Sequence, residues 1–122
     1  TKSVITVDAN MSLDKLVDEF FFKFRYTSFP VISEDQLVGL IILHDVKEVE
    51  KSKWPETKAS EAMIPVQDSI LIKPDAEVMD ALTKMATSGI GRLLVIEDSR
   101  LIGIVSQRDI MRLFEVKADL GG

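Results

Sequence analysis

The chain has 122 residues, of which 46% are hydrophobic and 29% charged, and its formal net charge is −5. Its longest apolar run, residues 37–43, is far shorter than the roughly 18 residues of a membrane span, so the composition is that of a soluble globular domain. The acidic balance argues against binding to nucleic acid or anionic lipid through charge alone, because such binding favours a basic face. Without cysteine and with one histidine, the chain has no disulfide, thiolate metal site or multi-histidine metal centre, which fits a reducing cytoplasm. Because it begins at Thr1 with no signal-like segment, we expect a fragment of a longer protein.

The chain opens with a strand and an amphipathic helix. Residues 4–7 are β-branched, as a short strand requires. Apolar side chains then recur at i, i+3, i+4, i+7 and i+11, which is one face of a helix that ends near Arg25. They are Leu13, Leu16, Val17, Phe20 and Phe24. Phe22 points away from this face, so it is either an ordinary exposed aromatic or part of a contact with another subunit or domain.

A hairpin and a second helix complete the first half. Residues 29–32 and 37–42 are apolar strands joined by a short polar link, and their continuous apolar character predicts a sheet covered on both faces. From residue 43 the pattern is helical, and it ends in a charged run before Trp54.

The same order of elements restarts in the second half. The expected elements are a helical turn at 57–64, a strand at 69–72, a helix at 78–86, strands at 93–96 and 101–105, and a last helix with Ile110, Leu113 and Phe114 inward. Gly89 ends the long helix, because glycine accepts the left-handed conformation of a helix C-terminus. Each half therefore reads strand, helix, strand, strand, helix.

The two halves are copies at a spacing of 64 residues. The stretch 103–109 runs from an apolar strand into a helix start, and 39–45 reads the same way. Because a unit of roughly 55 residues buries a poor fraction of its surface, we expect the copies to share a core. The predicted fold is one α+β module of two β-α-β-β-α repeats, packed sheet to sheet about a pseudo-twofold axis. Residues 1–53 form the first repeat, and 54–122 the linker and second repeat.

The ordered motifs resemble a tandem pair of cystathionine-β-synthase (CBS) domains, also called a Bateman module. The matching segments of the second copy are 62–66, 74–81, 94–96 and 101–110, and those of the first are 12–16, 29–32, 37–40 and 45–46. The resemblance implies regulation of an attached enzyme or transporter, frequent homodimerisation, and adenine nucleotides (AMP, ADP, ATP or a related adenosyl ligand) bound in the cleft between the copies. It implies no catalytic residue, no metal and no required cofactor.

The resemblance also implies roles for residues of the second copy. Asp109 would accept hydrogen bonds from the ribose hydroxyls, and Ser106, Arg108 and Arg92 would contact phosphate. The adenine would lie near Ile64 and Ile70. The pair Ser106 and Asp109 is also a helix-capping pattern, so a purely structural role stays open.

The first copy departs from this pattern. At the 64-residue spacing Ile42 stands in place of Ser106, and Ser28 in place of Arg92. Asp45 is retained, and His44 replaces Arg108 as a weaker, pH-dependent cation or as a simple exposed helix-start residue. We therefore expect an asymmetric module with a better-equipped site at Asp109 than at Asp45.

Other functions are less well supported by the residues. A hydrolase triad of Ser106, His44 and Asp109 lacks a nucleophile elbow and an oxyanion-hole glycine cluster, so we expect no enzyme activity in this segment. A structural dimerisation module without nucleotide binding is the alternative. The linker resembles that of CBS pairs attached to site-2-type membrane zinc metallopeptidases, which would place the module on the cytosolic face of a membrane without inserting into it.

Overall fold

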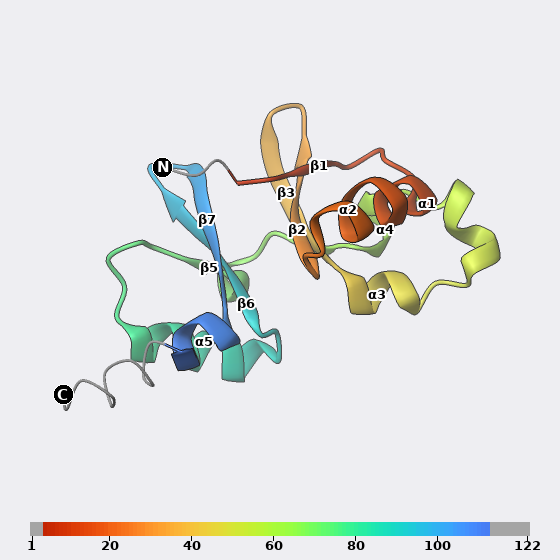
Figure 1. Ribbon diagram of the computed structural model, residues 1–122. Helices are drawn as coiled ribbons and strands as arrows, with labels where there is room; N and C mark the ends of the chain where they lie inside the picture. The colour runs from red at the N-terminus through yellow and green to blue at the C-terminus, as the bar shows by residue number, and fades with distance from the viewer. Residues whose placement is uncertain (1–3, 113–122) are drawn as a thin grey trace. The chain divides into compact units, whose positions relative to one another are not determined.

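The computed structural model describes residues 4–112, which divide into two compact units (Figure 1). The first is Ile5–Val66, and the second comprises Val4 and the residues from Gln67 onward. Residues 54–66, which the sequence pattern groups with the second repeat, thus lie in the first unit. The predicted α+β class is confirmed, and the described residues contain no helix long and apolar enough to cross a membrane. Leu113 and Phe114 lie outside the described residues, whereas Ile110 is buried as predicted.

The first unit is a four-stranded sheet with helices on one face. Its elements are β1 (Val7–Asp8), α1 (Leu13–Leu16), the π-helical turn η1 (Val17–Phe21), α2 (Phe22–Phe24), β2 (Ser28–Ser33), β3 (Gln36–Ile42), α3 (Leu43–Lys47), the 3-10 helix η2 (Lys51–Glu56), α4 (Ala59–Ala62) and β4 (Ile64–Pro65). The strand order is β1-β2-β3-β4, with β1 parallel to β2 and the other pairs antiparallel. The first strand is thus shorter and later than the sequence predicts.

The second unit repeats this plan with three strands. Its elements are the 3-10 turn η3 (Asp68–Ile70), β5 (Leu71–Ile72), α5 (Val78–Ser88), β6 (Arg92–Glu97), β7 (Arg100–Ser106) and a helix that covers residues 107–112 of the described chain. The order is β5-β6-β7, again with one parallel and one antiparallel pair. Its core lies between the sheet and α5, and Gly89 ends α5 at φ 73° as predicted.

The two hairpins agree residue by residue at the 64-residue spacing. Ser28 pairs with Ile42 as Arg92 pairs with Ser106, and both hairpins carry a bulge at the same place. Their two-residue loops also match, because Glu34, Asp35, Asp98 and Ser99 all have positive φ. Such loops follow the right-handed twist of the paired strands. The predicted repeat is therefore a repeat of hydrogen-bond register as well as of sequence.

The first helix of the first unit contains one residue more than its counterpart. The Phe22 N–H donates to Val17 O, five residues back, which makes a π-helical turn within the helix. The extra residue moves the apolar face by one position, so Phe21 is buried and Phe20 and Phe24 are only half-buried. Phe20 and Phe24 nevertheless pack against the first core, as the predicted apolar face requires, and Phe21 joins them there. Phe22 is 72% exposed, as predicted.

The linker, residues 51–66, closes the open end of the first core. Backbone N–H groups of Ala59 and Ser60 donate to Met11 O and Ala9 O at 2.8 and 3.0 Å, and Ala59 is fully buried. The chain then pairs with β3 as β4. A Cβ at Gly39 would lie 2.5 Å from Met63 Sδ and 2.6 Å from the Ile64 carbonyl oxygen, so only glycine permits this approach.

We expect Gly39→Ala to lower the free energy of unfolding by about 1–3 kcal/mol, because the new methyl group collides with backbone of β4. Gly103, at the equivalent place in β7, is the matched control: its nearest neighbour is Val95 Cβ at 3.9 Å. Gly103→Ala should change stability by about 0.5 kcal/mol or less. Urea unfolding of the two variants measures the difference, and equal effects would contradict the assigned role of Gly39.

Candidate functional site

Four of the predicted site residues gather where β7 ends and the last helix begins. Ser106 is the last residue of β7, and its cross-strand partner is Arg92, the first residue of β6. Arg108 and Asp109 follow in the first turn of the helix, and both are exposed. The hairpin register therefore brings one hydroxyl, two guanidinium groups and one carboxylate to the same end of the second sheet.

Ser106 and Asp109 hold each other in a reciprocal capping box. The Asp109 N–H donates to Ser106 Oγ at 3.2 Å, and the Ser106 N–H donates to Asp109 Oδ2 at 3.1 Å. The Gln107 N–H donates to Gly91 O at 2.8 Å and ties the helix start to the strand before it. The structural role left open by the sequence is thus present, and it also fixes the position of the carboxylate.

The two isoleucines predicted to lie near adenine occupy different places. Ile64 is half-buried on β4, in the first unit. Ile70 lies at the end of η3 in the second unit and has no exposed surface, so contact with a ligand would require this side chain to become exposed. Ile64 therefore belongs to the other unit than Asp109, whereas Ile70 is buried in the same unit as Asp109.

The equivalent end of the first unit has the same backbone but different side chains. The Leu43 N–H donates to Thr27 O at 2.9 Å, as Gln107 does to Gly91. Ile42 takes the N-cap position of α3 and supplies no side-chain cap. Asp45 is half-buried, and His44 is 78% exposed with its Nε2 3.4 Å from Glu48 Oε1. The hydroxyl–carboxylate pair of the second unit therefore has no counterpart here.

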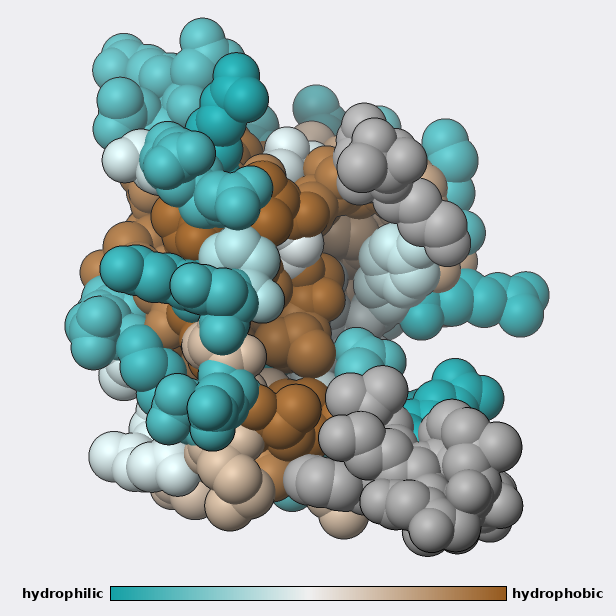
Figure 2. All heavy atoms as spheres, turned by 90° about the vertical axis from the view of Figure 1, so that its left-hand side faces the viewer, coloured by the Kyte–Doolittle hydropathy of each residue, from teal (hydrophilic) through white to brown (hydrophobic). Residues whose placement is uncertain are grey.

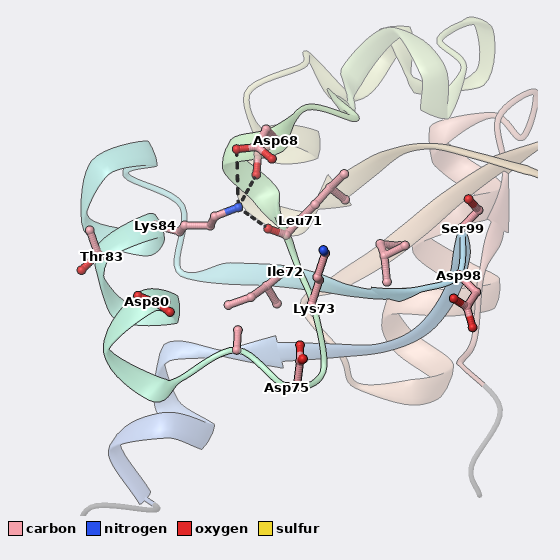
Figure 3. Close-up of a pocket in the computed structure, with 12 residues that line it drawn as sticks. Asp68, Leu71, Ile72, Lys73, Asp75, Asp80, Thr83, Lys84, Asp98 and Ser99 are labelled. Carbon is pink, nitrogen blue, oxygen red and sulfur yellow. Dashed lines mark hydrogen bonds and ion pairs between the residues drawn. The ribbon is translucent and has the colours of Figure 1, made fainter.

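A groove that the sequence analysis did not identify lies at the other end of the second sheet (Figure 3). It has a volume of about 700 Å³ and is lined by the β5–α5 loop, one side of α5 and the β6–β7 turn. The Lys84 ammonium donates to Leu71 O at 2.7 Å and Asp68 O at 3.0 Å. No predicted site residue lines this groove, and its lining residues are spread over η3, β5, the β5–α5 loop, α5, β6 and the β6–β7 turn. In residues 4–112, no three His, Asp or Glu side chains cluster as a metal site would require.

Ser106→Ala should lower the free energy of unfolding by about 1 kcal/mol, because the Asp109 N–H loses its partner. Ser106→Thr keeps the hydroxyl and should stay close to the parent. Conversely, Ile42→Ser should gain stability by supplying the cap that α3 lacks. Thermal and urea unfolding check all three, and an unchanged Ser106→Ala would contradict the capping role.

This chain is similar to segments of longer proteins. An inosine-5'-monophosphate dehydrogenase of Methanocaldococcus jannaschii is 34% identical over 114 residues, which cover 91% of this chain and 22% of that protein. A zinc metalloprotease of the same organism is 27% identical over 123 residues, or 98% of this chain and 33% of that protein. The chain thus spans less than half the length of these relatives.

Solved structures share the fold. The structure of CBSX2 in complex with AMP has a TM-score of 0.78 at 19% identity, covering 95% of this chain and 91% of that one. The CBS domain of a bacterial CNNM/CorC family Mg²⁺ transporter in complex with ATP has a TM-score of 0.77 at 16% identity, covering 90% and 78%. A family model for the CBS domain matches this chain twice, at residues 1–52 and 59–116. The chain therefore belongs to the CBS-domain family, as a tandem pair that forms a regulatory rather than a catalytic module.

Proposed function

We propose that the chain is a ligand-sensing module that binds an adenine nucleotide at the end of β7 and controls an attached enzyme or transporter. The observation that carries this proposal is the Asp109 carboxylate, which the Ser106 N–H holds at the exposed start of the last helix. Two proteins of the same fold are known in complex with AMP and with ATP, which supports this class of ligand.

The side chains around Asp109 suit a phosphorylated nucleoside. One carboxylate oxygen, Oδ2, accepts the Ser106 N–H, so Oδ1 is available for the vicinal hydroxyls of a ribose. Arg108 and Arg92 provide positive charge for phosphate, and guanidinium groups bind phosphate oxygens through paired hydrogen bonds. The net charge of −5 is compatible with this, because the cations are placed locally.

The proposed site is asymmetric between the repeats. Ile42 lacks a hydroxyl, Ser28 lacks a charge, and His44 lies within reach of Glu48. An anion would therefore be bound more weakly at the Asp45 position than at the Asp109 position. We propose one effective site in the second repeat.

The domain under control belongs to a longer protein. Matched relatives include a nucleotide-synthesis enzyme and a zinc metalloprotease, and in both the matched segment is a minor part of the chain. We propose an attachment of this kind, with a metallopeptidase as one candidate parent on the cytosolic side of a membrane. Ligand binding would favour one state of the second repeat, and the attached domain would respond to that bias.

Calorimetric titration with AMP, ADP and ATP tests the nucleotide site. Asp109→Asn keeps an acceptor for the Ser106 N–H but removes the charge, and it should weaken binding at least tenfold. Asp45→Asn is the matched control and should leave the affinity nearly unchanged. Two equal sites in the parent, or a loss of binding in Asp45→Asn alone, would contradict the proposed asymmetry.

A structural dimerisation module is the second candidate, because Phe22 and Tyr26 expose 72% and 54% of their surface in the first unit. A dimerisation module without a ligand predicts no change in melting temperature with nucleotide but a dimer that depends on concentration. A nucleotide sensor predicts a higher melting temperature, since a ligand that binds only the folded state stabilises it. Thermal melts with AMP and sedimentation at several protein concentrations separate the two.

A further inference from the structure

Three apolar side chains that are fully buried in the first unit, where the linker packs, have counterparts in the second unit that are only half-buried. Leu13, Val31 and Ile41 have no exposed surface in the first unit. Their counterparts Val78, Val95 and Val105 pack against the second core but are only half-buried. Figure 2 shows apolar surface exposed between polar side chains on the face that includes the second unit. We attribute this difference in burial to the linker, because residues 51–66 pack on the core of the first unit.

The outer edge of the second sheet could pair with an additional strand. In the first unit β3 pairs with β4, whereas among the described residues no strand pairs with the outer edge of β7. Gly39 is required because Met63 and Ile64 approach it closely, yet a Cβ at Gly103 would make only ordinary van der Waals contact with Val95, at 3.9 Å. Ile102 beside it is 42% exposed.

In the described part of the chain, backbone groups at the start of α5 also lack hydrogen bonds that their counterparts in the first unit form with the linker. In the first unit the Leu13 N–H donates to Thr57 O at 2.9 Å, and Ala9 O and Met11 O accept N–H groups from the linker. At the start of the helix the spacing of the repeats is 65, so the counterparts are the Val78 N–H, Pro74 O and Ala76 O. Within the described residues these three groups form no backbone hydrogen bond. Ala76 also lines the groove of Figure 3.

We infer that this surface, formed by the edge of β7, Gly103 and the start of α5, is the docking site of a polypeptide segment joined directly ahead of Thr1 in a longer chain. The occupant would lie on the second unit as the linker lies on the first: a short helix with a small buried residue like Ala59, followed by a strand along β7. Its backbone would supply partners for Val78, Ala76 and Pro74.

The spacing of the repeats identifies this occupant. Ile64 contacts Gly39, and at an offset of 64 residues its counterpart is the position immediately before Thr1. Val4, the first described residue, groups with the second unit and not with the strand that follows it. The matched relatives are several times longer than this chain, and in a protein of that length a preceding segment could take this role.

This docking would join a preceding domain to the repeat that carries Asp109. The segment would pair with β7, and β7 ends at Ser106, the partner of the Asp109 carboxylate. The inference does not depend on nucleotide binding, because it concerns the outer edge of β7 and the start of α5, whereas the proposed nucleotide site lies at the end of β7 and the start of the last helix.

A graft tests the inference. A second copy of residues 51–64 is placed directly ahead of Thr1, which restores the spacing found in the first unit. The control chain carries the same residues in scrambled order. We expect the graft, and not the scrambled segment, to raise the melting temperature and to slow exchange of the Val78 amide hydrogen at least tenfold, by giving that N–H a partner.

Gly103→Ala provides the specific counter-test. In the grafted chain it should abolish both effects, because its methyl group occupies the space of the docked strand, whereas in the chain that begins at Thr1 it should shift the melting temperature only slightly. Equal effects of the graft and the scrambled segment would overturn the inference, as would an unprotected Val78 amide in the grafted chain. Protection of Val78 that rises with concentration in the ungrafted chain would also overturn it, since the occupant would then be a second copy.

Discussion

The register of the two hairpins is the constraint on which the site depends. In each repeat the pairing places the first residue of one strand opposite the last residue of the next, and the following helix starts at that point. Antiparallel strands cannot slip by one residue without turning every side chain to the other face. Matching loops and bulges keep the register the same in both repeats. Because the last helix begins directly after β7, the position of Asp109 relative to Arg92 is set by the sheet.

The same scaffold carries different chemistry in its two copies. A capping box stabilises the helix start in the second repeat and orients a carboxylate, whereas the first repeat has an apolar residue at the cap. In the proposed site, the two side chains that stabilise the helix start would also serve recognition, and a ligand would bind to a carboxylate that is already positioned. Pre-positioning of this kind lowers the ordering cost of binding.

Much of the fold could be predicted from local pattern because the pattern occurs twice. The hairpins, the helix that ends at Gly89 and the α+β class follow from apolar periodicity and turn residues. The π-helical turn could not be predicted from periodicity, because it depends on which carbonyl accepts the Phe22 N–H. Its only trace in the sequence is a change in repeat spacing from 65 to 64 along the helix. The extra residue brings Phe21 into the core, and Phe20 packs against that core.

The candidate site was predictable in part. Ser106, Arg92, Arg108 and Asp109 lie together as the repeat implies, but the complete burial of Ile70 results from packing of the whole unit. The burial of Ala59 in the first core likewise depends on contacts between residues far apart in sequence. The same holds for the pairing of the two-residue strand β4 with β3. Such short elements carry no periodic pattern, so only the structure reveals them.

We propose that the second repeat holds the effective nucleotide site. Mapping of backbone amide chemical shifts during titration with AMP tests this proposal directly. We expect the largest changes at Gly91, Arg92, Ser106 and Asp109, and small changes at Thr27, Ile42 and Asp45. Changes of equal size at both sets, or changes confined to the first repeat, would contradict it.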